Sequence, residues 1–394
     1  MTPAARVQAA IELLDAIIAA SQSNGAAADT LIKRYFRERR YAGSKDRRAV
    51  RELVYRAIRR YGSAPHNGRS ALAGLTQDEP ELRDCFDGSQ HGPAPLASNE
   101  IGTPPTDIPD WLRAKFSDVV DDADIDSLSG RAPLDIRVNL SRTDRASVIQ
   151  AIEGATAGQL SASAVRLPQG FPIEQHDLWR DGLVDIQDEG SQHIVECCDA
   201  QPGMTIIDLC AGAGGKTLAL HEQMGGAGTI LACDIDRKRL SRLEPRAQRS
   251  GKTNIDIRLL DPGKEAEMLS DMAGAADLVL VDAPCTGTGT WRRNPESLWR
   301  MSEKAIARYA DTQAKLLEIA APLVKPGGYL VYIVCSLLAQ EGEGQISNFL
   351  QSCSDFRKDA PASTVGTAAG DGYLLTPARN ETDGFFFARL QRSC

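Results

Sequence analysis

The sequence lacks the cysteine and histidine spacing of a metal site. Its nine cysteines include no C-x-x-C pair, Cys197 and Cys198 are adjacent, and the five histidines are scattered. Zinc sites need closely paired ligands, and a disulfide framework needs an even set of cysteines. We therefore expect no bound metal, and we expect most of the thiols to be reduced and buried.

Long apolar runs are also missing. Charged or polar residues interrupt every run well before the roughly 20 residues that a membrane span requires. The first residues, Met1 to Arg6, open an amphipathic pattern and lack the apolar segment of a secretory leader. With 42% apolar and 25% charged residues, the composition is that of an ordinary globular protein. We expect a cytoplasmic monomer without a membrane partner.

Positive charge is scarce overall but concentrated in one segment. The net charge is −8, yet residues 31–61 contain twelve basic and three acidic residues, a local charge of +9 that leaves −17 for the rest of the chain. A basic segment on an acidic protein can contact phosphates, as in nucleic-acid binding, or can be a solvated helix face. Composition alone does not separate these two interpretations.

The 394 residues are enough for two or three domains. Apolar residues recur at helical spacing from residue 5 to about residue 60, which predicts an all-helical N-terminal domain. Residues 62–107 are rich in Gly, Pro, Ser and Asp and read as a linker with a short helix around residues 72–86. We place the first domain at residues 1–107.

A mixed pattern follows, and then a regular alternation. A strand at residues 134–139 precedes a helix at residues 141–152 with Thr143 or Asp144 as N-cap, so residues 108–181 form a small α+β module. From residue 182 to 394, strands alternate with helices, which predicts a doubly wound parallel sheet. Its strands are expected at residues 205–209, 229–234, 255–260, 278–282 and 329–335, with a long helix near 302–323 and a terminal hairpin formed by residues 372–375 and 384–390.

Two cysteines follow two of these strands. Cys285 comes after the apolar run that ends at Asp282, and Cys335 comes directly after the run from Tyr329 to Val334. Ligands of open α/β sheets bind beyond the carboxyl ends of the strands. A single cysteine there would most simply be a small buried hydrophobe, but two on neighbouring strands favour chemistry in which a thiolate attacks an unreactive ring.

A glycine-rich loop follows the first strand of the sheet. It reads Asp208-Leu209-Cys210-Ala211-Gly212-Ala213-Gly214-Gly215-Lys216-Thr217. A phosphate-binding loop would need Gly in place of Cys210, and the dinucleotide spacing G-x-G-x-x-G is also missing. Asp234 ends the next strand, where a carboxylate can accept the ribose hydroxyls of an adenosine cofactor, and Asp261 ends the third, where it could bond the adenine amino group. Together these features point to S-adenosylmethionine.

The residues around Cys285 distinguish between acceptors of a methyl group. Amino-group methyltransferases carry [D/N]-P-P-[Y/F], where this chain has Asp282-Ala283-Pro284-Cys285. An amine needs only its lone pair, whereas C5 of a pyrimidine becomes nucleophilic only after a thiolate adds to C6. Asp282 is placed to act as an acid near N3 of such a ring.

At this point the sequence resembles the RsmB/NOL/NSUN family of RNA cytosine-C5 methyltransferases, and within it the bacterial 16S rRNA branch. The resemblance covers nearly the whole chain. Its motifs are Pro109-Asp110-Trp111-Leu112, Arg137-Val138-Asn139, Gln187 to Gln192, Asp208 to Thr217, Asp234-Ile235-Asp236 with Arg239 to Arg242, Asp282 to Gly289, Arg292 to Pro295, Val334-Cys335-Ser336 and Asp383 to Phe386.

The resemblance implies a class I Rossmann-like methyltransferase sheet, a NusB-like RNA-binding helical domain and an RNA-recognition role for the α+β module. It implies methylation of cytidine C5 in 16S rRNA, with Cys335 as the nucleophile, Cys285 assisting release of the base, and Asp282 beside them. S-adenosylmethionine would be held by Cys210, Ala211, Gly212, Ala213, Gly214, Gly215, Lys216, Asp234, Arg239, Asp261 and Asp282. Trp291, Arg292, Arg293 and Arg300 would flank the RNA entrance.

Three positions depart from the family pattern. Ala213 stands where the family usually has Pro, Val334 stands where it has Thr, and Gln340-Glu341-Gly342-Glu343 replaces an acidic-Asn stretch. None of these changes removes a reacting group. The alternatives to a 16S rRNA enzyme are an RNA-binding ribosome-assembly factor with weak or lost catalysis, methylation of another RNA such as tRNA, and a DNA cytosine methyltransferase. A DNA enzyme would use Cys285 as nucleophile and would need a target-recognition domain after the core.

Overall fold

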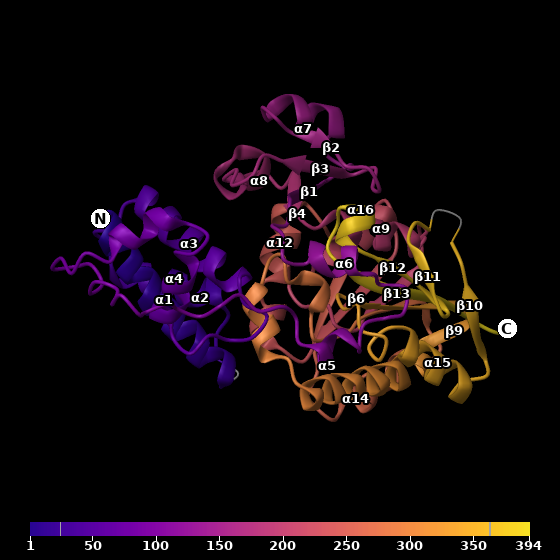
Figure 1. Ribbon diagram of the computed structural model, residues 1–394. Helices are drawn as coiled ribbons and strands as arrows, with labels where there is room; N and C mark the ends of the chain where they lie inside the picture. Colours follow the sequence, from indigo (N-terminus) through magenta and orange to yellow (C-terminus); the bar gives the residue numbers. More distant parts are fainter. Residues whose placement is uncertain (24, 362–363) are drawn as a thin grey trace. The chain divides into compact units, whose positions relative to one another are not determined.

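The protein consists of two compact units, and the computed structural model describes residues 1–23, 25–361 and 364–394 (Figure 1). The first, here called the helical unit, combines Met1–Phe116 with the distant segment Thr290–Glu303. The second, the sheet unit, combines Ser117–Gly289 with Lys304–Cys394. The chain thus passes from one unit to the other three times.

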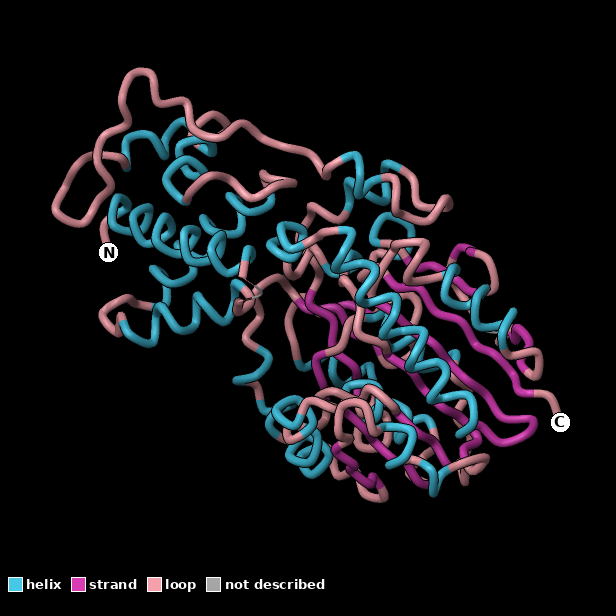
Figure 2. Tube along the Cα trace, turned by 90° about the horizontal axis from the view of Figure 1, so that it is seen from below, coloured by secondary structure: helices cyan, strands magenta, loops and turns pink. Residues whose placement is uncertain are grey.

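The predicted helical character of the N-terminus is confirmed; Figure 2 shows helices and loops there. The first helix, α1, begins after Thr2, whose side chain accepts a hydrogen bond from the Ala5 N–H, and has Pro3 at its first position. Its apolar face, with Leu14 and Ile17 fully buried, packs in the core of the unit. The elements of the unit are α1 (Pro3–Gln22), α2 (Ala28–Glu38), α3 (Ser44–Arg59), α4 (Gly68–Leu75), the 3-10 helix η1 (Pro80–Cys85), α5 (Asp110–Arg113) and the 3-10 helix η5 (Pro295–Arg300).

The expected single helix around residues 72–86 is wrong. Helix α4 ends at Leu75, and a separate 3-10 turn, η1, begins at Pro80. Proline has no N–H to donate and its ring clashes with the preceding helical turn, so the α4 helix does not continue through it.

The segment Thr290–Glu303 is an integral part of the helical unit. The Trp299 indole N–H donates to the Tyr61 carbonyl at 2.7 Å, and Glu296 accepts the Ala28 N–H at 2.9 Å at the start of α2. Arg300 donates to the carbonyls of Gly25 and Ala26. Trp291 and Arg292, expected at an RNA entrance, are buried instead, and the Trp291 ring packs edge-on against Phe116.

A small antiparallel sheet opens the sheet unit. Its strand order is β2-β3-β1-β4, with β1 (Leu134–Val138), β2 (Thr156–Ala157), β3 (Ala164–Leu167) and β4 (Val184–Ile186). Although β4 lies beyond residue 181, it pairs with β1. Helix α7 (Arg145–Ala151) begins at the predicted N-cap Asp144, whose side chain accepts from the Ser147 N–H.

The large sheet has the predicted parallel core. Its order is β11-β12-β13-β9-β8-β5-β6-β7, and the five strands from β9 to β7 run parallel. Strands β5, β6 and β8 and the second half of β9 are rich in Val, Ile and Leu and largely buried, as expected when both faces of a sheet are covered. The edge strand β7 contains no buried residue. Their bounds are β5 (Thr205–Asp208), β6 (Thr229–Asp234), β7 (Ile255–Leu259), β8 (Ala276–Asp282) and β9 (Val324–Val334).

The C-terminal end closes this sheet with the predicted antiparallel pair. Strand β13 pairs antiparallel with both β9 and β12, and β10 pairs with β13 outside the main order. The strands are β10 (Phe356–Asp359), β11 (Thr367–Ala369), β12 (Gly372–Leu375) and β13 (Phe385–Arg392).

Helices connect and cover these strands (Figure 1). The predicted long helix is α14, which is followed by one 3-10 turn, η6. The helical elements of the unit are α6 (Asp122–Ser127), η2 (Ile173–Gln175), α8 (Asp177–Arg180), α9 (Glu189–Cys197), α10 (Gly215–Gln223), α11 (Arg237–Leu240), α12 (Leu243–Arg249), α13 (Glu265–Met268), η3 (Ser270–Met272), α14 (Glu303–Ala320), η6 (Ala321–Leu323), α15 (Glu343–Ser352) and α16 (Pro377–Asn380), with η4 (Thr288–Thr290) at the junction of the two units. Within the described ranges, none of the helices is long and apolar enough to cross a membrane.

Replacement of Trp299 by Ala should destabilise the helical unit. The change removes a half-buried indole and its hydrogen bond to the Tyr61 carbonyl, which we expect to cost about 2–4 kcal/mol of unfolding free energy. Urea unfolding, with hydrogen exchange of the α1 and α3 amides as local readout, measures this loss.

The control is Glu303→Ala in the same segment. Glu303 is exposed and its ion pair with Lys115 spans 3.6 Å, so its removal should change the stability by less than about 0.5 kcal/mol. Equal effects of the two substitutions would show that the segment does not stabilise the unit.

Candidate functional site

The two cysteines lie beyond the carboxyl ends of neighbouring strands, as predicted. Strands β8 and β9 pair in parallel, with Asp282 opposite Ile333. Cys285 and Cys335 therefore follow equivalent points on the two strands. The loops that carry them are fixed by backbone hydrogen bonds, since the Ala283 N–H donates to Ile333 and the Gly289 N–H donates to the Cys335 carbonyl.

The two thiols are in contact. Their Sγ atoms are 3.4 Å apart, and both cysteines are half-buried and reduced. The hydrogen bond with Cys335 and burial raise the pKa of Cys285 well above its ordinary value. Burial and the neighbouring thiol thus favour the protonated form of Cys285.

An ion pair joins the glycine loop to the end of β8. The Lys216 ammonium donates to Asp282 Oδ2 at 2.7 Å. Burial alone would lower the pKa of Lys216, but the charge of Asp282 and its hydrogen bond outweigh burial, and the charge of Cys335 adds to them, so the pKa lies above its ordinary value. Lys216 thus remains an ammonium facing both Asp282 and the sulfur of Cys335.

The glycine loop has the conformation that its sequence predicts. Gly212 and Gly214 have φ angles of 55° and 85°, in the left-handed region that favours glycine. A Cβ on Gly214 would lie 2.6 Å from Leu243 Cγ, and one on Gly212 would lie 2.6 Å from the Arg239 guanidinium. The Arg239 side chain therefore lies against the backbone of the glycine loop at Gly212. The resemblance implied that both belong to the cofactor site.

The expected cofactor carboxylates occupy different environments. Asp234 is buried, and its two oxygens accept the Gly212 N–H and the Asp236 N–H, each at 2.7 Å. Each carboxylate oxygen has two acceptor positions, so Asp234 can still accept hydroxyl donors. Asp261 is exposed two residues beyond β7, which ends at Leu259.

A buried carboxyl below the glycine loop was not predicted. Asp208, at the end of β5, is 1% exposed and accepts the Thr217 hydroxyl at 2.6 Å. Burial raises its pKa to about 7, and the nearby charge of Asp282 adds to that shift. Its position before the glycine motif was visible in the sequence, but only the fold shows that it is enclosed.

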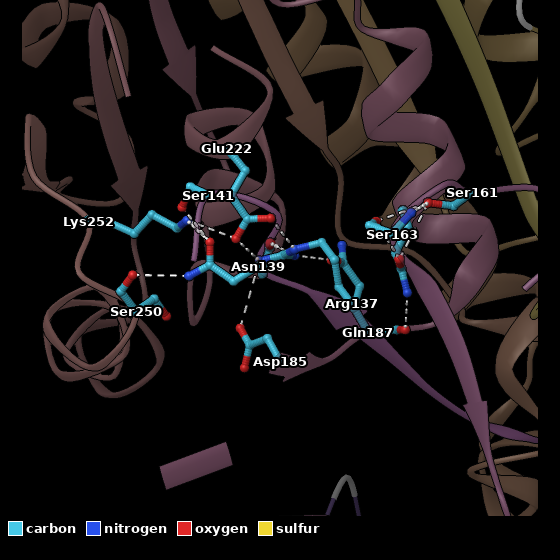
Figure 3. Close-up of polar contacts among 12 residues, drawn as sticks. Arg137, Asn139, Ser141, Ser161, Ser163, Asp185, Gln187, Glu222, Ser250 and Lys252 are labelled. Carbon is cyan, nitrogen blue, oxygen red and sulfur yellow. Dashed lines mark hydrogen bonds and ion pairs between the residues drawn. The ribbon is translucent and has the colours of Figure 1, made fainter. Parts of the chain in front are cut away.

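A second unpredicted feature is a pair of arginines that donate hydrogen bonds to carbonyls of the glycine loop. Arg137 of β1 donates to the Gly215 carbonyl at 3.0 Å, and Arg246 of α12 donates to the Ala213 carbonyl at 2.7 Å. Figure 3 shows the network around Arg137, in which Glu222 of α10 accepts from Arg137 and pairs with Lys252 at 2.9 Å. The small sheet thereby contacts the loop that the cofactor would use.

This network is buried and needs all of its partners. Lys252 is 2% exposed at its side chain, and burial lowers its pKa. It also donates to Asn139 Oδ1 at 3.0 Å, and the Asn139 amide donates to the Ser250 carbonyl (Figure 3). The same amide donates to the Gly182 carbonyl. Removal of one member of such a buried charge network leaves another charge unpaired, at a cost of several kcal/mol. The sequence feature that could have indicated this network is the Arg137-Val138-Asn139 motif, which supplies two of its members.

Comparison with known proteins assigns the chain to a family. The family model described as "16S rRNA methyltransferase RsmB/F" matches residues 195–391, half of the chain and nearly all of the large sheet. The chain belongs to the RsmB/F methyltransferase family. The matched residues include the glycine loop, Asp282, Cys285 and Cys335.

Similar proteins extend the RsmB/F match. The probable ribosomal RNA small subunit methyltransferase B of Synechocystis is 34% identical over 305 residues, which cover 73% of this chain and 67% of that protein. The chain spans 61–67% of the length of the curated relatives that it matches. A methyltransferase homologue from Pyrococcus horikoshii has a TM-score of 0.59 at 26% identity, over 68% of this chain and 90% of that one. The crystal structure of PH0851 has a TM-score of 0.79 at 24% identity, over 100% and 99% of the two chains, so it shares the fold.

No group of His, Cys, Asp and Glu side chains in the described part of the chain could hold a metal ion. The candidate site of this RsmB/F member brings together two thiols, an ion pair and a glycine loop.

Asp208→Asn should change how stability depends on pH. The folded-state pKa of Asp208, about 7, lies above its ordinary value of 3.8. Between about pH 4 and pH 7 the unfolded chain therefore releases this proton while the folded protein keeps it, and the free energy of unfolding falls as the pH rises. Below about pH 4 both states are protonated and the full stability is present. Asn mimics the protonated acid. The variant should therefore gain stability relative to the parent by about 2–4 kcal/mol between pH 4 and pH 8.

Urea unfolding at four pH values measures this difference. The same substitution at Asp256, which is exposed on β7, is the control and should leave the pH profile of the parent. A constant stability difference between Asp208→Asn and the parent at all pH values would contradict the prediction.

Proposed function

We propose that this chain is an S-adenosylmethionine-dependent methyltransferase that methylates C5 of a cytidine in RNA, with 16S rRNA as the substrate. The observation that carries the proposal is the pair of thiols, 3.4 Å apart, at the edge of the sheet beside the Lys216–Asp282 ion pair. An enzyme acting on an amino group would have no need of two sulfurs there.

The residues around the glycine loop fit the cofactor. Gly212 and Gly214 keep side chains away from the turn, and Asp234 can accept the hydroxyls of a ribose. Cys210 to Lys216, Asp234, Arg239, Asp261 and Asp282 would hold the cofactor. When bound, S-adenosylmethionine supplies a methyl group as an electrophile.

The two cysteines divide the work on the base. Cys335 adds its thiolate sulfur to C6 of the cytosine, which turns C5 into a nucleophile, while Asp282, held by Lys216, would hydrogen-bond the ring near N3. Once C5 carries the methyl group, it loses its proton to a base and the Sγ–C6 bond breaks, which restores the ring. Cys285 lies next to the leaving sulfur and assists this release.

The helical unit is the proposed RNA-binding domain, of the NusB type, and the small sheet would contribute to RNA recognition. In α2, α3 and the loop between them, most of the basic side chains are exposed. Arg39 instead stacks on Tyr35 and pairs with Glu12. The exposed basic residues, here called the basic patch, are Lys33, Arg34, Arg37, Arg40, Lys45, Arg47, Arg48, Arg51 and Arg56.

Two other functions make different experimental predictions. An RNA-binding assembly factor would bind S-adenosylmethionine, or RNA alone, without transferring a methyl group to any RNA. An enzyme for another RNA, such as tRNA, would methylate that RNA in place of 16S rRNA. The retained pair of Cys285 and Cys335 favours catalysis over both a decayed site and simple binding.

The two cysteine variants test the mechanism directly. With S-adenosylmethionine and unmodified small-subunit rRNA, Cys285→Ala should accumulate a covalent protein–RNA adduct, because Cys335 can attack but release is slow. Cys335→Ala should form no adduct and transfer no methyl group, yet bind the cofactor with unchanged affinity. A denaturing gel detects the adduct, and calorimetry measures cofactor binding.

Cys353→Ala, a substitution of a half-buried thiol on the loop after α15, should behave like the parent protein. An adduct in Cys335→Ala but not in Cys285→Ala would reverse the two roles. Methyl transfer by Cys335→Ala would overturn the mechanism.

Neutralising the basic patch should weaken RNA binding and reduce its salt dependence. With Arg37, Arg40 and Arg48 changed together to Gln, the slope of log K against log salt should decrease by about 2–3, because each lost phosphate contact removes about 0.7–0.9. The matched control changes three exposed basic residues of α14, Lys304, Arg308 and Lys315. If both triple variants show the parent's slope, the patch is only a solvated surface.

A further inference from the structure

One buried carboxylate, that of Glu341, is hydrogen-bonded to the residues that follow both cysteines. Glu341 is fully buried and accepts four hydrogen bonds from side chains and backbone of the sheet unit. Its Oε1 accepts the Thr286 N–H at 2.9 Å, and its Oε2 accepts the Ser336 hydroxyl at 2.6 Å and the Thr286 hydroxyl. Thr286 directly follows Cys285, and Ser336 directly follows Cys335. Glu341 therefore joins the two loops at the residues next to the thiols.

Two further elements fix the carboxylate. The Gln313 amide, on α14, donates to Glu341 Oε1 at 3.0 Å and to the Pro284 carbonyl at 2.9 Å, one residue before Cys285. The Tyr332 hydroxyl, on β9, donates to the Glu341 carbonyl at 2.7 Å. The carboxylate oxygens thus accept four hydrogen bonds, three from side chains and one from the Thr286 backbone N–H, which suits a group that only accepts.

The arrangement adds buried side-chain contacts to the backbone hydrogen bond that joins the two loops, from the Gly289 N–H to the Cys335 carbonyl. Both cysteines lie outside the strands that precede them, in segments without helix or strand. The hydroxyls of Thr288 and Ser336, 3.1 Å apart, add a second contact between the loops. The strand pairing ends before either cysteine, so the separation of the two sulfurs depends on these buried side-chain contacts together with the backbone hydrogen bond from Gly289 to Cys335.

The carboxylate also acts on Cys285 by its charge. After the bond to Cys335 and burial, the charges of Cys335 and Glu341 further raise the pKa of Cys285, while the Gly287 N–H opposes them. Cys285 in turn raises the pKa of Tyr332, which is otherwise raised mainly by burial. A charge at Glu341 thus favours the thiol form of Cys285.

We propose that Glu341 is a positioning residue that holds the Cys285 and Cys335 loops together so that one base can contact both sulfurs. This inference rests on the proposed function, because it assumes that both thiols act on the same cytosine. Glu341 does not touch the base; it acts through Thr286 and Ser336.

The test compares Glu341→Ala and Glu341→Gln with Glu343→Gln. Gln keeps the volume and one carbonyl acceptor, so it preserves part of the contact if Ala prevents folding. Glu343 is the matched control, since it also carries one negative charge but accepts from Ser117 and not from the cysteine loops. Thermal unfolding establishes that each variant is folded.

The first measurement is cross-linking of the two sulfurs by dibromobimane, which becomes fluorescent when it bridges two close thiols. The parent and Glu343→Gln should cross-link at the same rate, and the Cys285→Ala variant gives the background. Glu341→Ala should cross-link at least about tenfold more slowly. Unchanged cross-linking in both Glu341 variants would overturn the proposal, whatever their activity.

The second measurement separates kcat from KM in methyl transfer. Loss of loop position should lower kcat by about 100-fold in Glu341→Ala, with a smaller loss in Glu341→Gln, and leave the KM for S-adenosylmethionine unchanged. Slower cross-linking with unchanged kcat would also overturn the positioning role. If the parent protein itself transfers no methyl group, the proposed function fails and not the inference about the loops, which the cross-linking rates report independently.

Discussion

The parallel pairing of β8 with β9 is the constraint on which the site depends. Parallel neighbours end at the same edge of a sheet, so the residues that follow them converge without any contribution from sequence proximity. Fifty positions separate Cys285 from Cys335, and yet their sulfurs touch. The antiparallel strand β13 completes the far side of β9 and buries it, which keeps this edge of the sheet fixed.

The glycine loop depends on a different kind of support. Its left-handed glycines supply shape, but its carbonyls are held by Arg137 and Arg246, from the small sheet and from α12. Because Arg137 also belongs to a buried charge network with Glu222 and Lys252, the small sheet and the loop are energetically linked. A change in the small sheet can reach the loop through polar contacts that have little freedom to rearrange.

The sequence predicted features that repeat along the chain, and missed those that depend on enclosure. The strand alternation, the adjacency of the two cysteine strands and the N-cap Asp144 follow from periodicity and local chemistry. The enclosed Asp208 and the four donors around Glu341 do not, since burial arises only when distant segments pack together. The helix expected around residues 72–86 is divided in two, because α4 ends at Leu75 and Pro80 begins a separate 3-10 turn.

The helical unit is discontinuous in the chain, and this has a consequence for how the protein folds. Synthesis delivers α1 to α5 first, but the bundle lacks the side chains of Trp291, Glu296 and Trp299 until residue 303 has been made. Domains usually fold one after another during translation. Here the first helices must wait, with part of their core open, while the eight strands β1 to β8 of the other unit emerge. Apolar surface that stays exposed in this way is prone to aggregation and is a target for chaperones. A gene fragment that ends at residue 116 would encode an incomplete bundle.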